Sequence, residues 1–172
     1  MENFNFKAYT EMIFGKGQIT NLPEVISRYG KNILLAYGGG SIKRNGIYDS
    51  VKKLLKDYNI IELDKIEPNP KIETVRRGVK LCKENNIDVI LAVGGGSTID
   101  CAKVVAAGAF YDGDPWDLVT NPEKIDKVLP IVTILTLAAT GSEMNGNAVI
   151  SKMDTNEKLG TASVNMKPQV SI

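Results

Sequence analysis

The sequence has 172 residues, 43% hydrophobic and 24% charged, a composition that fits one globular domain with its own core. Lys and Arg number 21 against 20 Asp and Glu, a net charge of +1, which argues against a nucleic-acid partner. The N-terminus has no signal-peptide core and no apolar run reaches membrane length, so we expect a cytoplasmic protein with no membrane partner.

Four apolar runs alternate with helical patterns along the chain. The runs that predict buried strands are 32–37, 59–63, 87–93 and 129–137. The patterns that predict helices are 47–57, 72–84 and 98–110, with a short helix or turn at 113–117. This alternation favours an α/β fold with a parallel sheet and helices on both faces.

The two ends of the chain are less regular. Weak alternation over 4–15 predicts an edge strand, and two short strand-like pieces follow residue 145, at 148–151 and 161–164. Neither end contains enough structure for a second domain. We therefore expect a single Rossmann-like domain over 1–172.

Cysteine and histidine usage restricts the chemistry. Cys82 and Cys101 stand outside any CxxC or zinc-finger spacing, and we expect both to be reduced thiols in the core. The chain has no histidine, although imidazole is the commonest metal ligand and the commonest acid–base near neutral pH. We therefore expect neither a catalytic residue nor a metal site within this chain.

The strongest local motif is ILAVGGGSTIDCAK at 90–103, in which a buried strand runs into glycines and a helix begins at once. Glycine lets the backbone approach a ligand closely, and the free N–H groups at a helix start attract anions. We interpret Gly95, Gly96 and Ser97 as a cradle for a diphosphate, with Asp100 in the first helical turn. The alternative is an ordinary strand-to-helix turn with Ser97 as the N-cap.

A second GGGS motif, at 38–41, also follows a predicted strand. Many dinucleotide sites place an acid there to bind the ribose 2′-hydroxyl, but this chain has glycines, followed by Lys43 and Arg44. With no carboxylate to repel a 2′-phosphate, NADP is favoured over NAD. The alternative is a plain loop with solvated basic residues.

The third motif, TLAATGSEMNGNAVI at 136–150, crowds small and hydroxyl-bearing residues together after a strand. Such a loop suits a backbone packed against a flat ligand; the alternative is an ordinary polar loop. Ligands of open α/β sheets bind at the carboxyl ends of the strands. We therefore expect the three motifs to converge there, joined by the turn at 68–70.

The motifs IEPNP, AVGGGSTIDCAK and TLAATGSE, in this order and after FGKGQITNLPEVI, resemble the iron-containing (group III) alcohol dehydrogenases over essentially the whole chain. The stretch YGGGSIKRNGIYD is most similar to the butanol dehydrogenase-like subgroup. The resemblance implies the dehydroquinate synthase-like N-terminal domain of a homo-oligomeric enzyme. Such an enzyme transfers hydride between NADP or NAD and a primary alcohol or aldehyde, such as butanol or butanal.

The resemblance also assigns dinucleotide contacts to positions in this sequence. The diphosphate and nicotinamide-ribose region is lined by Gly95, Gly96, Ser97 and Asp100. The adenosine ribose is faced by Gly38, Gly39 and Ser41. The other matched positions are Asn69, Thr136, Leu137, Asn145, Asn147, Val149 and Lys158.

The sequence departs from the family at its end. Family members continue into an all-helical domain whose one Asp and three His bind iron or zinc, and the first of these ligands follows a strand that KPQVSI at 167–172 resembles. This sequence stops there and has no histidine. We expect the metal domain to be absent and the chain to be inactive alone; the alternative is a stand-alone nucleotide-binding module without redox activity.

Overall fold

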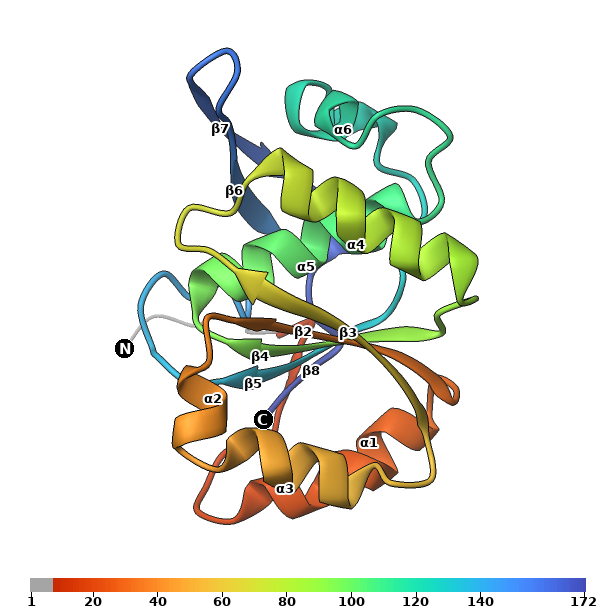
Figure 1. The fold of residues 1–172 in the computed structure, drawn as a ribbon, viewed down its shortest axis with the longest axis vertical. Coiled ribbons are helices and arrows are strands. Elements are labelled where there is room, and N and C mark those ends of the chain that lie inside the picture. Colours follow the sequence, from red (N-terminus) through yellow and green to blue (C-terminus); the bar gives the residue numbers. More distant parts are fainter. Residues whose placement is uncertain (1–7) are drawn as a thin grey trace, which may run out of the picture.

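A central parallel sheet lies between two layers of helices in the computed structural model, which describes residues 8–172 (Figure 1). The strand order is β1-β8-β5-β4-β2-β3, and all neighbours run parallel. The strands are β1 (Glu11–Met12), β2 (Asn32–Gly38), β3 (Asn59–Ile66), β4 (Val89–Gly94), β5 (Ile131–Leu135) and β8 (Val170–Ser171). The predicted Rossmann-like parallel sheet is confirmed.

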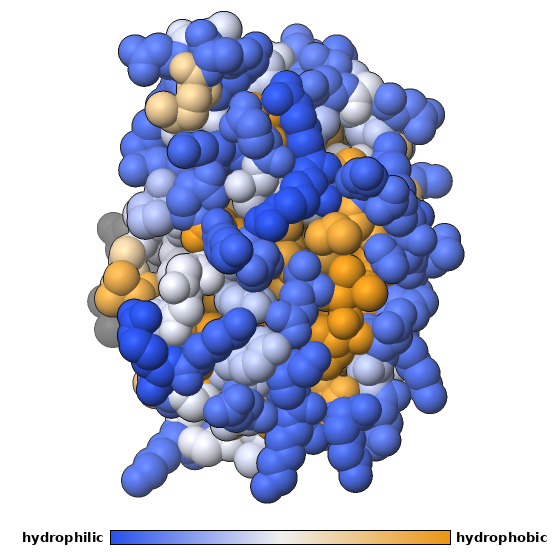
Figure 2. All heavy atoms as spheres, in the orientation of Figure 1, coloured by the Kyte–Doolittle hydropathy of each residue, from blue (hydrophilic) through white to orange (hydrophobic). Residues whose placement is uncertain are grey.

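Helices cover both faces of this sheet, as predicted. In Figure 1, α4 and α5 lie above it, and α1, α2 and α3 lie below. Their bounds are α1 (Leu22–Ser27), α2 (Ser41–Arg44), α3 (Ile47–Leu54), α4 (Ile72–Glu84) and α5 (Gly96–Gly108). The face in Figure 2 is hydrophilic over the helices, with a band of apolar atoms between the two layers, where β3 forms the edge of the sheet.

The alternating side chains of β2 and β4 divide the core in two. Side chains that point to the lower helices are Ile33, Leu35, Tyr37, Val89, Leu91 and Val93, and those that point to the upper helices are Leu34, Ala36, Ile90 and Ala92. Both faces of these strands are apolar because helices cover both. This explains why the central strands appear in the sequence as continuous apolar runs.

Helix α5 is the most buried helix of the described chain, since every residue from Cys101 to Gly108 is buried. Its small residues let it pack closely between the sheet and α4. At Gly78 of α4, an added Cβ would lie 2.6 Å from Cγ2 of Val105, so the two helices meet too closely for a larger residue. Cys82 and Cys101 are buried and unpaired, as predicted.

A hairpin and a short helix lie beyond α4 and α5. The hairpin joins β6 (Asn147–Lys152) to β7 (Glu157–Ala162) in antiparallel register, and the helix is α6 (Trp116–Thr120). Three 3₁₀ turns complete the described chain: η1 (Gln18–Asn21), η2 (Pro122–Lys124) and η3 (Val164–Met166). No helix among residues 8–172 is both long and apolar enough to cross a membrane.

Several predicted boundaries were wrong. The helix predicted over 47–57 ends at Leu54, and the separate helix α2 before it was not predicted. Gly46, in left-handed backbone at φ 79°, separates these two helices. The strand piece predicted at 161–164 belongs to β7 only up to Ala162, and the chain then turns into η3.

The chain start also differs from the prediction. Of the edge strand predicted over 4–15, residues 4–7 lie outside the described part of the chain. The described part contains only the two-residue β1, which pairs with β8 at the far edge from β3. This pairing brings residues 11–12 beside residues 170–171.

Candidate functional site

The two GGGS turns lie side by side at the carboxyl edge of the sheet. β2 and β4 are neighbours, with Tyr37 paired to Val93. From β2 the chain continues to the lower helices and to β3, whereas from β4 it continues through α5 to β5 on the other side. Connections that diverge in this way open a crevice between the two strand ends, which is the usual ligand site of an open α/β sheet.

The turn after β4 leads into an uncapped helix start. Gly95, in extended backbone, is the N-cap of α5, and in the described chain no side chain caps it. The amides of Thr98 and Ile99 donate to the Gly95 carbonyl, so the preceding amides of Gly96 and Ser97 have no partner within the helix. The interpretation of Ser97 as the N-cap is therefore wrong. Free amides at the start of a 13-residue helix are available to attract an anion.

Close neighbours restrict larger residues at two positions of this turn. An added Cβ at Gly94 would lie 2.5 Å from Oγ1 of Thr98, and one at Gly96 would lie 3.2 Å from Oγ1 of Thr140. The amide of Thr136 donates to the Gly94 carbonyl at 3.1 Å, which ties the loop after β5 to the turn. The glycines therefore form a cradle between α5 and this loop.

The β6–β7 hairpin forms the far rim of the site. The Val149 amide donates to Oδ2 of Asp100 at 3.1 Å, which joins the hairpin to α5. Nζ of Lys158 donates to Oδ1 of Asn69 at 2.8 Å, which joins it to the turn after β3. Asn69 itself is in left-handed backbone, at φ 54°.

A buried lysine lies behind this rim. The side chain of Lys103 is fully buried, and its ammonium donates to Oγ of Ser142 and the carbonyl of Asn147, both at 2.8 Å, and to Oδ1 of Asn145 at 3.2 Å. Burial lowers the pKa of Lys103 to about 8, although the nearby carboxylates of Asp100 and Glu143 oppose this shift.

Sequence reasoning missed Lys103. The available signal was a single lysine inside CAKVVAAGAF, a run otherwise small and apolar. A lysine in such a helix is fully buried only when its ammonium finds acceptors. Lys103 is therefore part of a buried polar network and not of a solvated face.

The turn after β2 is more open. Gly39 has nothing within 4 Å of an added Cβ, and Gly40, at φ 110°, leads into the four-residue helix α2. Nζ of Lys43 lies 5.2 Å from the ring centre of Tyr37 and 4.7 Å from that of Tyr48. Lys43 thus lies over two aromatic rings. Arg44 is the other basic side chain that follows this turn in the sequence.

A carboxylate lies beneath this turn, but it belongs to β3. Glu62 accepts hydrogen bonds from the hydroxyls of Tyr37 at 2.6 Å and Tyr48 at 2.7 Å, and pairs with Lys52 at 3.4 Å. Burial raises the pKa of Glu62, but these three donors more than offset it, so the net shift is downward. The carboxylate is thereby occupied within the protein.

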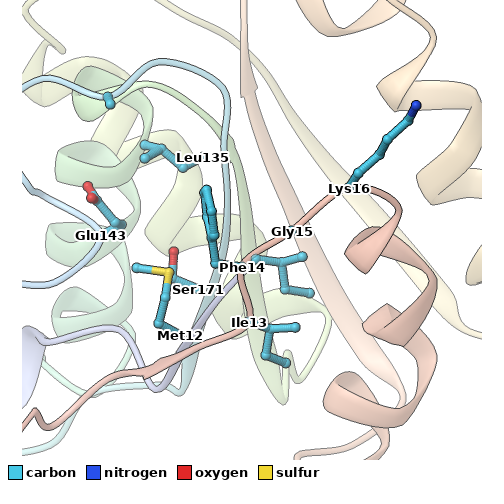
Figure 3. Close-up of a pocket in the computed structure, with 10 residues that line it drawn as sticks. Met12, Ile13, Phe14, Gly15, Lys16, Leu135, Glu143 and Ser171 are labelled. Carbon is cyan, nitrogen blue, oxygen red and sulfur yellow. The ribbon is translucent and has the colours of Figure 1, made fainter.

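An apolar pocket of about 620 Å³ adjoins the loop after β5. Figure 3 shows its walls coming from the chain start and from the ends of β5 and β8. The lining residues include Met12, Ile13, Phe14, Leu135, Ala138 and Ile172. Phe14 is 91% exposed, so this pocket offers an uncovered apolar surface beside the crevice. The sequence did not reveal it, because residues from opposite ends of the chain form it.

All predicted contact positions are partly or fully exposed. They are Gly38, Gly39, Ser41, Asn69, Gly95, Gly96, Ser97, Asp100, Thr136, Leu137, Asn145, Asn147, Val149 and Lys158. Within residues 8–172, no three His, Cys, Asp or Glu side chains come together as ligands.

The fold and these motifs match a known family. The sequence profile of the iron-containing alcohol dehydrogenases matches residues 10–172. The chain belongs to this family. It is 56% identical to NADH-dependent butanol dehydrogenase A of Clostridium acetobutylicum, covering 100% of this chain and 45% of that protein.

Other relatives agree. The chain is 43% identical to the NADPH-dependent aldehyde reductase YqhD of Escherichia coli, covering 98% of the chain and 44% of that protein. The crystal structure of NADH-dependent butanol dehydrogenase A from Thermotoga maritima superposes with a TM-score of 0.93 at 45% identity, over 100% of this chain and 44% of that one. The chain thus spans less than half the length of these relatives.

Proposed function

We propose that this chain is the dinucleotide-binding part of an NAD(P)H-dependent alcohol dehydrogenase or aldehyde reductase. The turn from Gly94 to Ser97 carries the proposal. It lies at the crevice between β2 and β4, it presents free amides at the start of a long helix, and it has close neighbours at Gly94 and Gly96. These features together suit a diphosphate.

The other contacts follow from the position of that turn. The amides of Gly96 and Ser97 hold the diphosphate, and Gly38, Gly39 and Ser41 face the adenosine ribose. On the opposite side, exposed Leu137 and Val149 offer apolar surface to the flat nicotinamide ring. The bound dinucleotide supplies or accepts the hydride.

Polar side chains on the hairpin side complete the proposed site. Lys158 and Asn69, joined by a hydrogen bond, lie at the rim where the nicotinamide ribose would enter. The remaining matched positions on this side are Asp100, Thr136, Asn145 and Asn147. Their role in the proposal is to orient the ribose and the ring, not to transfer a proton.

The substrate of the parent enzyme, in this proposal, is a primary alcohol or aldehyde such as butanol or butanal. The apolar pocket beside Leu135 and Ala138 has the chemistry to accept an alkyl chain. The names of the butanol dehydrogenase relatives support this substrate class. We further propose that the parent enzyme is a cytoplasmic homo-oligomer. Light scattering of the whole protein tests its oligomeric state.

The chain alone is proposed to be inactive. The sequence has no histidine, and residues 8–172 gather no metal-ligand group. Resemblance to the family places the iron or zinc ligands in the part of the relatives that this chain does not cover. Reading the gene downstream tests this: a continuation into a helical segment that contains histidines supports the dehydrogenase, and a stop codon at this point supports the stand-alone module.

The proposed preference for NADPH is modest, at most about tenfold. The open space at Gly39 and the lack of an acid in the turn favour a 2′-phosphate. Two observations reduce the expected preference. Lys43 is stacked over Tyr37 and Tyr48, and the relatives at 53–56% identity are named as NADH-dependent.

Calorimetry of the purified chain with NADPH and NADH tests the proposed function. We expect a Kd of about 0.1–1 mM, because a single wall buries less ligand surface than a closed cleft. Butanal and NADPH with added ferrous or zinc ions should give no turnover above the metal-free blank. The lack of any heat signal at several millimolar nucleotide would refute dinucleotide binding, and clear turnover would refute inactivity.

A further inference from the structure

We propose that Lys103 is a positioning residue, whose buried ammonium holds the start of α5, the loop at 140–146 and the β6–β7 hairpin in one fixed arrangement. The wall of the crevice on the β4 side would then keep a constant shape. This inference rests on the proposed dinucleotide function and assigns a role to a buried side chain that is not itself a proposed contact but bonds to two of them, Asn145 and Asn147.

The geometry around the ammonium supports this role. Lys103 lies on α5, while its acceptors Ser142, Asn145 and Asn147 all lie beyond β5, some 40 residues further along the chain. One buried group therefore connects the helix behind the diphosphate turn to two segments on the hairpin side. The ammonium has three donors, and the structure provides three acceptors.

Asp100 extends the network to the rim. It lies three residues before Lys103, on the same face of α5. Oδ1 of Asp100 accepts the hydroxyl of Ser142 at 2.6 Å, and Oδ2 accepts the Val149 amide at 3.1 Å. Ser142 thus accepts from Lys103 and donates to Asp100. Both carboxylate oxygens are engaged, so Asp100 acts as part of the same support.

The loop is oriented by the amide of Asn145. Its Nδ2 donates to the Gly141 carbonyl at 2.9 Å, and its Oδ1 accepts from the Asn147 amide at 2.9 Å and from Lys103. The side chain thus bridges the loop to the start of β6. If Lys103 lost its ammonium, Asn145 would still hold the loop locally, but of these contacts with α5 only the two hydrogen bonds to Asp100 would remain.

Stability alone does not explain a lysine here. Burying an ammonium is costly, and replacing a buried polar network with a well-packed apolar residue is often neutral or stabilising. The other buried residues of α5 are small or apolar. The network fixes the relative position of segments that all carry proposed dinucleotide contacts.

Lys103→Met removes the ammonium and keeps an unbranched side chain. Lys80→Met is the matched control, since Lys80 is an exposed lysine of α4 paired only with Glu84 at 3.7 Å. In the full chain, hydrogen exchange of the Val149 amide and of the β6–β7 amides should speed up about tenfold in Lys103→Met. The amides of β4 should keep their protection in both variants.

Calorimetry adds a functional readout. NADH should bind about tenfold more weakly to Lys103→Met than to Lys80→Met, while AMP, which reaches only the adenosine end, should bind both equally. A purely structural defect would weaken both ligands together. Unchanged exchange at Val149, or equal losses for AMP and NADH, would overturn the proposal.

Ser142→Ala decides the case if Lys103→Met loses protection throughout β4 as well. This variant removes one hydroxyl and keeps the charge of Lys103. Faster hydrogen exchange confined to Val149 and the hairpin supports the positioning role of Lys103, whereas exchange at the wild-type rate refutes it. If the wild-type chain binds no NADH at all, the proposed function fails, and exchange at Val149 still decides the role of Lys103.

Discussion

The same four letters, GGGS, follow β2 and β4, yet the two turns differ in structure. After β4, the turn leads into a 13-residue helix, packed on all sides and tied to a buried polar network. After β2, it leads into a helix of four residues, which ends before Gly46. An added Cβ would lie 2.5 Å from its nearest neighbour at Gly94 and 3.2 Å at Gly96, whereas in the turn after β2 it would lie 3.2 Å from the Ile66 carbonyl oxygen at Gly38 and meet open space at Gly39.

The residues that follow each motif determine this difference. TIDCAKVVAAGAF consists mainly of small and apolar side chains that pack along the whole of α5, whereas IKRNG brings charge and a second glycine within one turn. A long buried helix provides an anion site at its start, and a four-residue helix has no comparable dipole. The motif alone therefore predicts a turn, and its surroundings decide which part of a ligand the turn suits.

Gly94→Ala should have the largest effect. The new Cβ would lie 2.5 Å from Oγ1 of Thr98, so α5 or the side chain must shift. We expect a loss of about 1–3 kcal/mol in the free energy of unfolding, measured by urea denaturation. Gly39→Ala is the control and should change stability by no more than about 0.5 kcal/mol. Equal losses at both positions would remove the contrast between the turns.

Much of the fold could be read from the sequence, and the reasons for the failures are physical. Buried parallel strands carry apolar side chains on both faces, so β2, β4 and β5 stood out. Helix α2 was missed because it has only four residues and begins after a glycine in left-handed backbone. Periodicity needs a longer segment than this to be recognised.

The site was predicted less completely than the fold. Glycine-rich turns after strands are local signals, so the turns at 38–41 and 94–97 could be recognised. Lys103 and its acceptors are about 40 residues apart, and the pocket joins Phe14 to Ile172. Contacts over such separations depend on the tertiary fold, and no local pattern in one sequence encodes them.

Gly39→Asp tests the open turn by its effect on nucleotide preference. The position has space for the side chain, and a carboxylate there should repel the 2′-phosphate and accept hydrogen bonds from the ribose hydroxyls. We expect NADPH to bind about tenfold more weakly, with NADH unchanged or tighter. Gly39→Asn, of similar size but neutral, should leave the preference near that of the wild type. Calorimetric losses equal for both nucleotides would place the adenosine ribose elsewhere.

The pH dependence of stability should also differ between the two turns. Because burial lowers the pKa of Lys103 from 10.5 to about 8, the unfolded chain binds more protons than the folded one between these values. Stability from this group therefore rises with pH above about 8. The downward shift of the Glu62 pKa beneath the other turn has the same sign but a different pH window, since its contribution is present at neutral pH and is lost as pH falls below 4.5.

Urea unfolding of the wild type and Lys103→Met at pH 7 and pH 9 measures the Lys103 contribution. The difference between the two proteins should move in favour of the wild type by on the order of 1 kcal/mol at the higher pH. A stability difference that stays constant would show that the folded and unfolded states bind the Lys103 proton equally. A difference that moves in favour of Lys103→Met would show that the folded state binds it more tightly.

The central claim is that the turn after β4 binds the diphosphate of a dinucleotide, and amide chemical shifts during an NADH titration of the ¹⁵N-labelled chain test it most directly. We predict that the amides of Gly95, Gly96 and Ser97 shift most, with smaller changes at Gly38 and Gly39 and none at the amino ends of the strands. No shift in the turn after β4 at several millimolar NADH, or larger shifts at the opposite edge of the sheet, would contradict the claim.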